Sequence, residues 1–255
     1  MRLATENLTW GVDGRAIVRD VTVEIGAGET VGLIGPNGCG KSSLLRCIAG
    51  LRAPSSGVVR HDGEDISGWD ARRVAQRLAF VEQAAESDSD LRVGDVVSLG
   101  RTPFRDRWRG LSAADHAIVD AALEHVDLTG LRDRHWNTLS GGERQRAHIG
   151  RALAQRPWAI LLDEPTNHLD IRHQLDLMEL LASSDQTVLV ALHDLALAAR
   201  YCDRLVLLSD GAVVADGTPE EVLTGERLRE VYEVDACVGR DVLGHLSISY
   251  RVEAR

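Results

Sequence analysis

A glycine-rich stretch at residues 35–43, GPNGCGKSS, contains the residue types that hold phosphate groups. It fits the pattern G-x-x-x-x-G-K-[ST], with an apolar run before it and helical spacing after it, as that pattern requires. Glycines let backbone N–H groups turn inward around phosphate oxygens, and the helix start adds partial positive charge. We expect Lys41 to reach the β- and γ-phosphates and Ser42 to bind Mg²⁺. The predicted nucleotide-binding residues are Gly35, Pro36, Asn37, Gly38, Cys39, Gly40, Lys41, Ser42 and Ser43.

A second stretch, AILLDEP at residues 159–165, ends an apolar run in two acids. Asp163 is expected at the carboxyl edge of a sheet, where α/β folds bind ligands, and could hold Mg²⁺ through water. Glu164 follows it and could act as general base on an attacking water. Alone, such a pair is as often a solvated strand end. The phosphate loop upstream favours the catalytic interpretation.

Two further polar residues end apolar runs in the same way, Gln83 and His193. The amide of Gln83 could reach Mg²⁺ or the attacking water, and the His193 ring could form a hydrogen bond with the γ-phosphate. Either residue alone is more often a polar strand end with no further role. Their assignment therefore depends on the rest of the set.

The stretch LSGGERQR at residues 139–146 raises a question about glycine. Ser140 with Glu143 three residues later is a capping box, which predicts a helix start. Gly141 and Gly142 are unfavourable there, since each costs up to about 1 kcal/mol relative to Ala in a helix. A backbone without Cβ can, however, approach a phosphate closely at a helix N-terminus. The stretch predicts a second phosphate-binding helix start, which indicates that the two elements serve different nucleotides.

Buried strands that alternate with helices must position these residues. Apolar strand patterns occur at 30–35, 77–83, 159–164, 186–194 and 203–211. Such alternation predicts an α/β fold, with a largely parallel sheet and helices on both faces. Residues 84–138 change to a polar loop and an amphipathic helix, so we expect a helical subdomain over about 84–155. The whole chain, 1–255, is expected to form one domain whose tail from about 226 is weakly patterned.

Composition limits the possible functions. The chain has 255 residues, 44% hydrophobic and 27% charged, and a net charge of −10, which disfavours nucleic acid as a partner. The absence of an apolar run near the roughly 18 residues of a membrane span, or of a leader at the start, predicts a cytosolic chain. The cysteines are scattered and are expected to be reduced. Cys39 lies beside Lys41 and a helix start, which predicts a reactive thiolate.

The stretch LSGGERQR, placed between the phosphate loop and ILLDEP, resembles the signature of the ATP-binding cassette (ABC) ATPases. The similar set also includes Gln83, NHLD at 167–170 and His193. The resemblance implies a P-loop nucleoside triphosphatase core with a mainly parallel sheet, an N-terminal antiparallel β subdomain and a helical signature subdomain. It also implies hydrolysis of ATP with Mg²⁺.

The same resemblance implies a second copy of the chain as partner. Two such cassettes pack head to tail, and the signature of one closes over the ATP held by the phosphate loop of the other. By resemblance, Ser140, Gly141 and Gly142 contact this nucleotide in trans, and Asp170 belongs to a loop that crosses the interface.

The base end of the expected site departs from the family's pattern. Such cassettes usually stack adenine on an aromatic residue just before the second strand. LTWGVDGRAIV places Val12 at that position, and Trp10 lies two residues earlier. Trp10 could take over the stacking if the loop is shifted, or it could be a plain core residue. Both alternatives stay open from the sequence.

The segment VVSLGRTPF at 96–104 and the tail at 228–241 are similar to those of importers for ferric siderophores, haem and cobalamin. The resemblance implies integral-membrane permease subunits in separate chains, a substrate-binding protein acting indirectly, and a peripheral place on the cytoplasmic face of the membrane. We expect four arginines to face the permease: Arg101, Arg105, Arg107 and Arg109. The alternative is a soluble ABC-type ATPase acting on ribosomes, DNA or iron–sulfur assembly. A small-molecule kinase is disfavoured by the signature.

Overall fold

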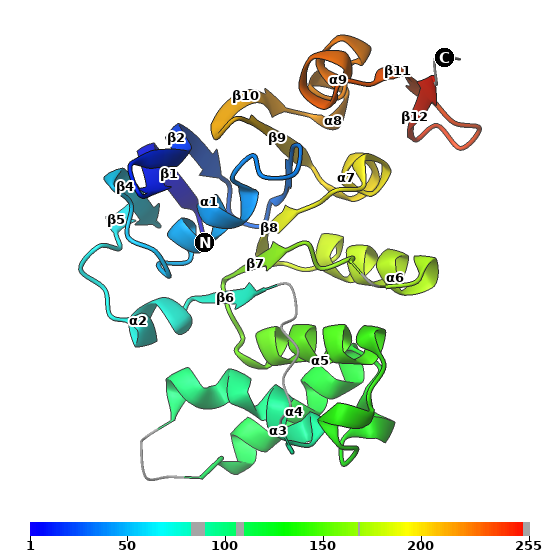
Figure 1. The fold of residues 1–255 in the computed structure, drawn as a ribbon. Helices are drawn as coiled ribbons and strands as arrows, with labels where there is room; N and C mark the ends of the chain where they lie inside the picture. The colour runs from blue at the N-terminus through cyan, green and yellow to red at the C-terminus, as the bar shows by residue number, and fades with distance from the viewer. Residues whose placement is uncertain (83–89, 106–109, 168, 252–255) are drawn as a thin grey trace.

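The structure is a computed structural model that describes residues 1–82, 90–105, 110–167 and 169–251, and a six-stranded sheet forms its centre (Figure 1). The strand order is β10-β9-β3-β8-β7-β6, and the neighbours are parallel except β10 with β9. The largely parallel sheet predicted from the apolar runs is therefore confirmed. The strands are β3 (Thr30–Ile34), β6 (Leu78–Val81), β7 (Ala159–Asp163), β8 (Thr187–Ala191), β9 (Arg204–Ser209) and β10 (Ala212–Gly217).

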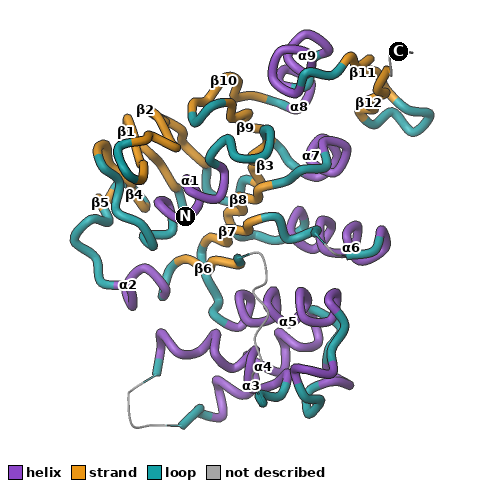
Figure 2. Tube along the Cα trace, in the orientation of Figure 1, coloured by secondary structure: helices purple, strands orange, loops and turns teal. Residues whose placement is uncertain are grey.

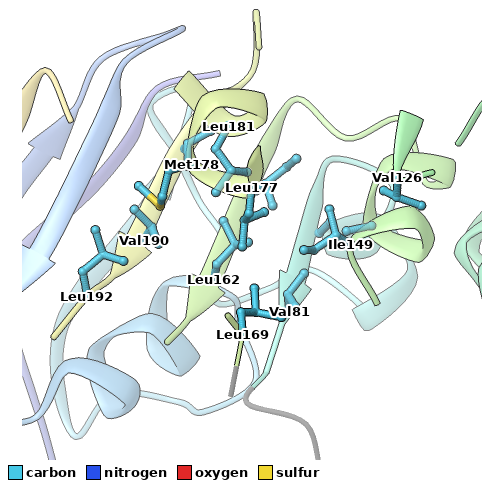
Figure 3. Packing of buried hydrophobic residues seen from close by; sticks show 14 of the residues in the cluster. Val81, Val126, Ile149, Leu162, Leu169, Leu177, Met178, Leu181, Val190 and Leu192 are labelled. Carbon is cyan, nitrogen blue, oxygen red and sulfur yellow. The ribbon is translucent and has the colours of Figure 1, made fainter. Parts of the chain in front are cut away.

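Successive side chains of a strand point to opposite faces of the sheet, and in the central strands both faces are buried. Their two sets of side chains belong to two separate hydrophobic clusters. One cluster joins the sheet to α1 (Lys41–Ile48) and the N-terminal strands. The other joins it to α6 (Ile171–Ala182) and α7 (Leu195–Tyr201). Figure 3 shows Leu177, Met178 and Leu181 of α6 beside Leu162 and Val190 of the sheet.

An antiparallel sheet at the N-terminus confirms the predicted β subdomain (Figure 2). Its order is β2-β1-β4-β5, formed by β1 (Leu3–Val12), β2 (Arg15–Ile25), β4 (Ser56–His61) and β5 (Glu64–Asp65). Asp13 and Gly14 join β1 to β2 with φ of 51° and 77°. Two positive φ values in a two-residue loop suit the twist of a hairpin, which fixes the register of the strands.

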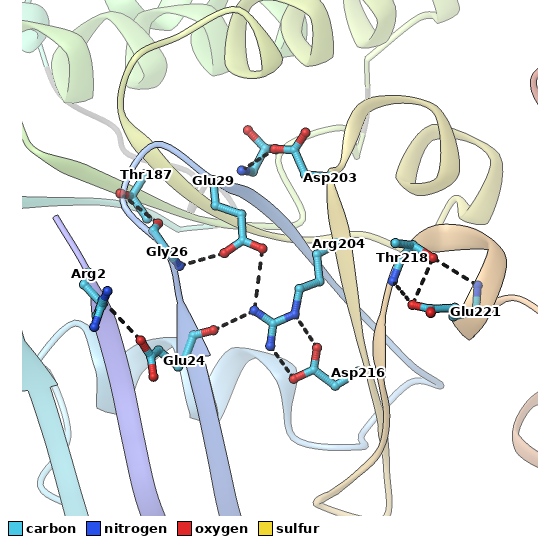
Figure 4. A network of polar contacts seen from close by, with 11 residues as sticks. Arg2, Glu24, Gly26, Glu29, Thr187, Asp203, Arg204, Asp216, Thr218 and Glu221 are labelled. Atoms are coloured by element: carbon cyan, nitrogen blue, oxygen red, sulfur yellow. Dashed lines mark hydrogen bonds and ion pairs between the residues drawn. The ribbon is translucent and has the colours of Figure 1, made fainter.

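A polar network ties this sheet to the central one (Figure 4). The Arg204 guanidinium on β9 contacts Asp216 of β10 at 2.5 Å and donates to the Glu24 carbonyl of β2 at 2.7 Å. Glu29 lies 3.5 Å from the same group. Because Arg204 bonds to both sheets, it holds β2 beside the β9–β10 edge.

The remaining helices between β6 and β7 lie together at the β6 edge of the sheet (Figure 1). Close packing explains Gly150, since a Cβ there would lie 3.2 Å from Val126 and 3.4 Å from Val97. The elements are α3 (Val93–Ser98), the 3-10 turn η1 (Leu99–Phe104), α4 (Ala113–His125), η2 (Thr129–Leu131), η3 (Trp136–Thr138) and α5 (Gly141–Ala154). The short helix α2 (Ala71–Ala75) precedes β6.

The tail contains more regular structure than its weak pattern predicts. It forms α8 (Pro219–Val222), α9 (Gly225–Tyr232) and a hairpin of β11 (Asp235–Arg240) and β12 (Leu246–Arg251). Val238 and Ile248 of the hairpin pack against the same cluster as α7, so tertiary contacts stabilise strands that lack a strong alternation. Among the described residues, no helix has the length and apolar character needed to cross a membrane.

A histidine on α5 makes the stability of the helical region depend on pH. The His148 ring packs edge-on against Trp136 with 5.0 Å between centroids, and neither ring nitrogen has a hydrogen-bond partner in the described part of the chain. Burial lowers the pKa of His148 to about 4, and Arg151 adds to the effect. Neutral His148 is therefore the form that the fold accommodates.

We expect the free energy of unfolding to fall as pH is lowered from about 6.5 to about 4, by about 2 kcal/mol from His148. The unfolded chain binds the proton first, so this contribution is complete above pH 6.5 and lost through that window. The variant His148→Phe should remove this part of the pH dependence, measured by urea unfolding. The exposed His116→Gln is the control, and equal slopes in all three proteins would contradict the account.

Candidate active site

The phosphate loop joins the carboxyl end of β3 to α1 and uses glycine where only glycine fits. Gly35 and Gly40 have φ of 147° and 107°, a region that side chains rarely adopt. A Cβ on Gly35 would lie 2.2 Å from the Leu208 carbonyl oxygen, and one on Gly40 would lie 2.8 Å from that of Ile17. The loop is thus pressed between neighbouring strands in the shape that the motif predicts.

Lys41 begins α1 and is buried, with 4% of its surface exposed. Its ammonium group donates to the Gly35 carbonyl at 2.8 Å and the Pro36 carbonyl at 3.2 Å. Its hydrogen-bond partners among the described residues are neutral carbonyls, so no acidic side chain there competes with a phosphate for this group. The lysine is therefore placed to attract phosphate oxygens within the loop.

Ser42 and Asp163 are 121 positions apart in the sequence and lie in contact in the structure. The Ser42 hydroxyl donates to Asp163 at 2.8 Å, and the Arg46 guanidinium lies 4.0 Å from the same carboxylate. Burial raises the pKa of Asp163, while the Ser42 hydrogen bond and Arg46 oppose that rise. A hydroxyl and a carboxylate are oxygen ligands of the kind Mg²⁺ prefers. These two residues fit the predicted metal site.

Glu164 and His193 also come together, from the ends of β7 and β8. The His193 ring nitrogen Nε2 contacts one Glu164 oxygen, and the Asn167 amide donates to the other at 2.8 Å. Glu164 has a φ of 53°, a left-handed conformation that is strained for a glutamate and typical of functional sites. Both carboxylate oxygens are therefore held, with one partner able to accept or donate a proton.

A cavity of about 440 Å³ lies over the phosphate loop. Several predicted residues line it: Gly38, Gly40, Lys41, Ser42, Ser43 and Glu164. Others that the sequence analysis did not name also line it: Arg15, Ala16, Ile17, Arg19, Asp210 and Gly211. Four other residues of the phosphate loop do not line the cavity. Gly35 and Cys39 are buried, and Pro36 and Asn37 also lie outside the lining.

The predicted signature begins α5 and does not line this cavity, and its Ser140 and Gly141 are exposed while Gly142 is half-buried. Ser140 caps the helix by accepting from Glu143 N–H at 3.3 Å, and Glu143 accepts from Ser140 N–H at 2.7 Å. A Cβ on Gly141 would have no described atom within 4 Å, and one on Gly142 would meet only Leu169 at 3.5 Å. The packing described within one chain therefore gives no reason for either glycine.

Asp170 lies at the N-cap of α6, where it accepts from the His173 N–H at 3.0 Å and contacts the His173 ring at 2.8 Å. These bonds hold the pKa of Asp170 below its ordinary value. The residue thus has a local capping role beside any contact with a second chain.

The base end of the cavity resolves the question about Trp10. This ring is 9% exposed and belongs to the hydrophobic core, with the Arg52 guanidinium 4.3 Å from its centroid. Trp10 is a core residue, so the alternative in which it stacks on a base is wrong. Val12 is 46% exposed at the end of β1, opposite Arg15.

Two expectations about charged and reactive groups are corrected. Arg101 does not face a partner: it is 8% exposed, pairs with Asp115 at 2.9 Å and donates to the Ala154 carbonyl at 2.9 Å. Cys39 is not a favoured thiolate, because burial raises the pKa of its thiol more than Lys41 lowers it. Three predicted residues lie outside the described residues: Gln83, Arg107 and Arg109.

We expect limited alkylation with iodoacetamide at neutral pH to label Cys237 before Cys39. Cys237 is exposed, whereas Cys39 is 5% exposed and its pKa is raised. Peptide mass spectrometry at low labelling would measure the order, with the buried Cys202 as the unreactive reference. Labelling of Cys39 first would contradict this correction.

The structure adds site residues that the sequence analysis missed. Arg46 lies one helical turn after Ser42, a spacing that could have indicated its approach to Asp163. Asn167 follows Glu164 by three residues and holds its carboxylate. The buried hydroxyl of Tyr232 on α9 lies near Gly35 and Cys39, and burial raises its pKa. No local sequence pattern connects the tail with the phosphate loop, so the position of Tyr232 could not be predicted from the sequence.

Comparison with known proteins agrees with this geometry. A family model described as ABC transporter matches residues 18–167. The ferric enterobactin transport ATP-binding protein FepC of Escherichia coli (strain K12) is 42% identical over 238 residues, covering 91% of this chain and 87% of that protein. The hemin import ATP-binding protein HmuV of Rhodopseudomonas palustris (strain BisA53) is 40% identical over 247 residues, covering 92% and 89%.

Solved structures give the same result. An inward-facing ABC transporter assigned to the metal-chelate type matches with a TM-score of 0.85 and 26% identity, covering 98% of both chains. A bacterial ABC transporter cassette in dimeric form matches with a TM-score of 0.75 and 29% identity, covering 85% of this chain and 98% of that one. This chain therefore belongs to the ABC transporter family and is one of its ATP-hydrolysing cassettes.

Proposed function

We propose that this chain is the ATP-hydrolysing subunit of an importer for an iron chelate, haem or a cobalamin, and that residues 1–255 act as one nucleotide-binding domain with a helical subdomain over about 84–155. The observation that carries the ATPase part is one cavity lined by Lys41, Ser42 and Glu164, of which Ser42 bonds to Asp163 and Glu164 contacts His193. Phosphate binding, metal binding and proton transfer are then available at a single site.

Each residue has a role in this proposal. The phosphate-loop N–H groups and Lys41 hold the β- and γ-phosphates. Ser42, Asp163 and Gln83 would hold Mg²⁺, which neutralises phosphate charge when bound. Glu164 takes a proton from the water that attacks the γ-phosphorus, while the bond to the leaving ADP oxygen breaks. His193 orients Glu164 and donates a hydrogen bond to the γ-phosphate, and Asn167 fixes the other carboxylate oxygen.

The exposed signature supports a composite site between two copies. Gly141 and Gly142 leave a helix N-terminus uncovered, and such an end with no Cβ in the way suits a phosphate. We propose that Ser140, Gly141 and Gly142 contact the γ-phosphate held by the second copy and that Asp170 lies at the interface. The dimeric form of a related cassette supports the pairing of two copies.

The importer assignment is supported by the resemblance at 96–104 and by the relatives' names. FepC is named for ferric enterobactin and HmuV for hemin, and this chain covers most of both. We propose integral-membrane permease subunits as direct partners, with the substrate-binding protein acting indirectly and the chain on the cytoplasmic face of the membrane. Arg105 and Arg107 are the proposed permease contacts, since Arg101 serves the interior of the helical region.

Deleting the gene tests the cargo. Growth under iron limitation and uptake of labelled ferric siderophore, haem and cobalamin would be compared with the parent strain and with a strain complemented by the Glu164→Gln variant. We expect one of the three uptakes to fall and only the wild-type gene to restore it. Normal uptake of all three, in a strain without a redundant system, would overturn the importer assignment.

A further inference from the structure

The nucleotide cavity lacks the aromatic platform on which a base usually stacks in related cassettes. None of the described residues that line it carries an aromatic ring. Trp10 is unavailable, because it is buried and Arg52 lies over its face. The end of the β1–β2 hairpin forms this wall instead, through Arg15, Ala16 and Ile17. Arg19, Asp210 and Gly211 complete the lining away from the phosphate loop, and none of them offers a ring either.

A β-bulge lies two residues from Arg15 in this wall. Trp10 pairs with Val18 and Gly11 pairs with Ala16, so Ile17 is an extra residue on β2. Bulges re-aim neighbouring side chains and are common near active sites. The Ile17 carbonyl lies against the phosphate loop at Gly40. Arg15 precedes Ile17 by two residues, which is roughly 6–7 Å along an extended strand.

The Arg15 guanidinium is free to bind a ligand. It is exposed, and it forms no hydrogen bond, ion pair or ring contact with another residue of the described ranges. Of the other two cations in the lining, Lys41 is held by two carbonyls of the loop, and the Arg19 side chain lies beside Gly211, where an added Cβ would be 3.4 Å from its Cγ. Val12 stands directly opposite Arg15 in the hairpin and adds an exposed apolar side chain beside it.

We propose that Arg15 is the base-stacking residue of this cassette, with its guanidinium plane against the purine and Val12 packed beside it. The inference rests on the proposed ATPase function and identifies the residue that sets its nucleotide preference. A guanidinium is planar and delocalised and stacks on flat rings, which a lysine ammonium does not do. Stacking uses a face that every base has, so ATP and GTP should bind with similar affinity.

Three substitutions separate stacking from simple charge attraction. Arg15→Ala should weaken Mg·ATP binding by about 3- to 10-fold, the range of an exposed to partly desolvated cation–π contact. Arg15→Tyr should restore most of the affinity because it returns a plane, and Arg15→Lys should not. Inorganic tripolyphosphate, which has no base, should bind equally to all four proteins. Arg2→Ala, which removes an exposed charge just before β1, is the control and should match the wild type.

Isothermal titration calorimetry on the full chain would measure these dissociation constants. An unchanged ATP affinity in Arg15→Ala would overturn the inference, as would affinity kept by Lys and lost by Tyr. A parallel loss of tripolyphosphate binding would also overturn it, since Arg15 would then be a phosphate contact. Wild-type protein that fails to bind Mg·ATP would overturn the proposed function itself, which distinguishes the two failures.

Discussion

Replacing Glu164 by Gln is expected to reduce ATP turnover by about 100- to 10,000-fold, the usual contribution of a general base. The amide keeps nearly the same shape and can still pair with His193 and Asn167, but it cannot accept the proton of the attacking water. Lys41, Ser42 and Asp163 are untouched, so Mg·ATP binding should persist. If two copies share each ATP, as proposed, a variant that binds ATP without hydrolysing it should also accumulate as an ATP-bound dimer.

Phosphate release and size-exclusion chromatography with Mg·ATP would measure both effects. Glu64→Gln is the matched control, since Glu64 is an exposed acid on β5 paired with Arg73. Its turnover should equal that of the wild type. Near-normal turnover in Glu164→Gln would remove this residue from the mechanism.

The second large effect is expected from Ser140→Arg. A long charged side chain at the start of α5 would block approach of a second copy to the exposed glycines, so turnover should fall by about 100-fold or more. Binding of Mg·ATP to the phosphate loop of the same chain should be almost unchanged. Both quantities can be measured on the purified cassette by phosphate release and calorimetry.

The control for this variant must also lose a helix cap, because Ser140 forms a capping box with Glu143. Ser112 forms the same kind of box with Asp115 at the start of α4. Ser112→Arg should cost about 1 kcal/mol of stability, as should Ser140→Arg. Only the latter should lose turnover, and equal losses of turnover in both would indicate a purely structural role for Ser140.

Much of this site could be predicted because its residues lie at the ends of strong apolar patterns. A short apolar run predicts a buried strand, and parallel strands bring their carboxyl ends to one edge. This logic assigned Ser42, Asp163, Glu164 and His193 to one site, and the structure then pairs Ser42 with Asp163 and Glu164 with His193. The role of the phosphate-loop glycines could also be predicted from the sequence, because a tight turn around phosphate needs them.

The remainder depends on tertiary contacts that no local pattern contains. The positive charge at Lys41 suggested a thiolate at Cys39, but desolvation opposes it and dominates. Arg101 belongs to a basic run, yet Asp115 and the end of α5 hold it inside. Trp10 is buried and Arg15 lines the cavity, on either side of a one-residue bulge that the sequence does not mark.

Mixing two inactive variants tests the central claim, that two copies share each ATP site. Chains with Ser140→Arg keep an intact phosphate loop, and chains with Lys41→Ala keep an intact signature. A heterodimer of the two has one composite site with both halves intact, so an equal mixture should recover up to roughly a quarter of wild-type turnover. Differently tagged chains would show that the heterodimer forms. No recovery in a mixture where it demonstrably forms would contradict the shared site.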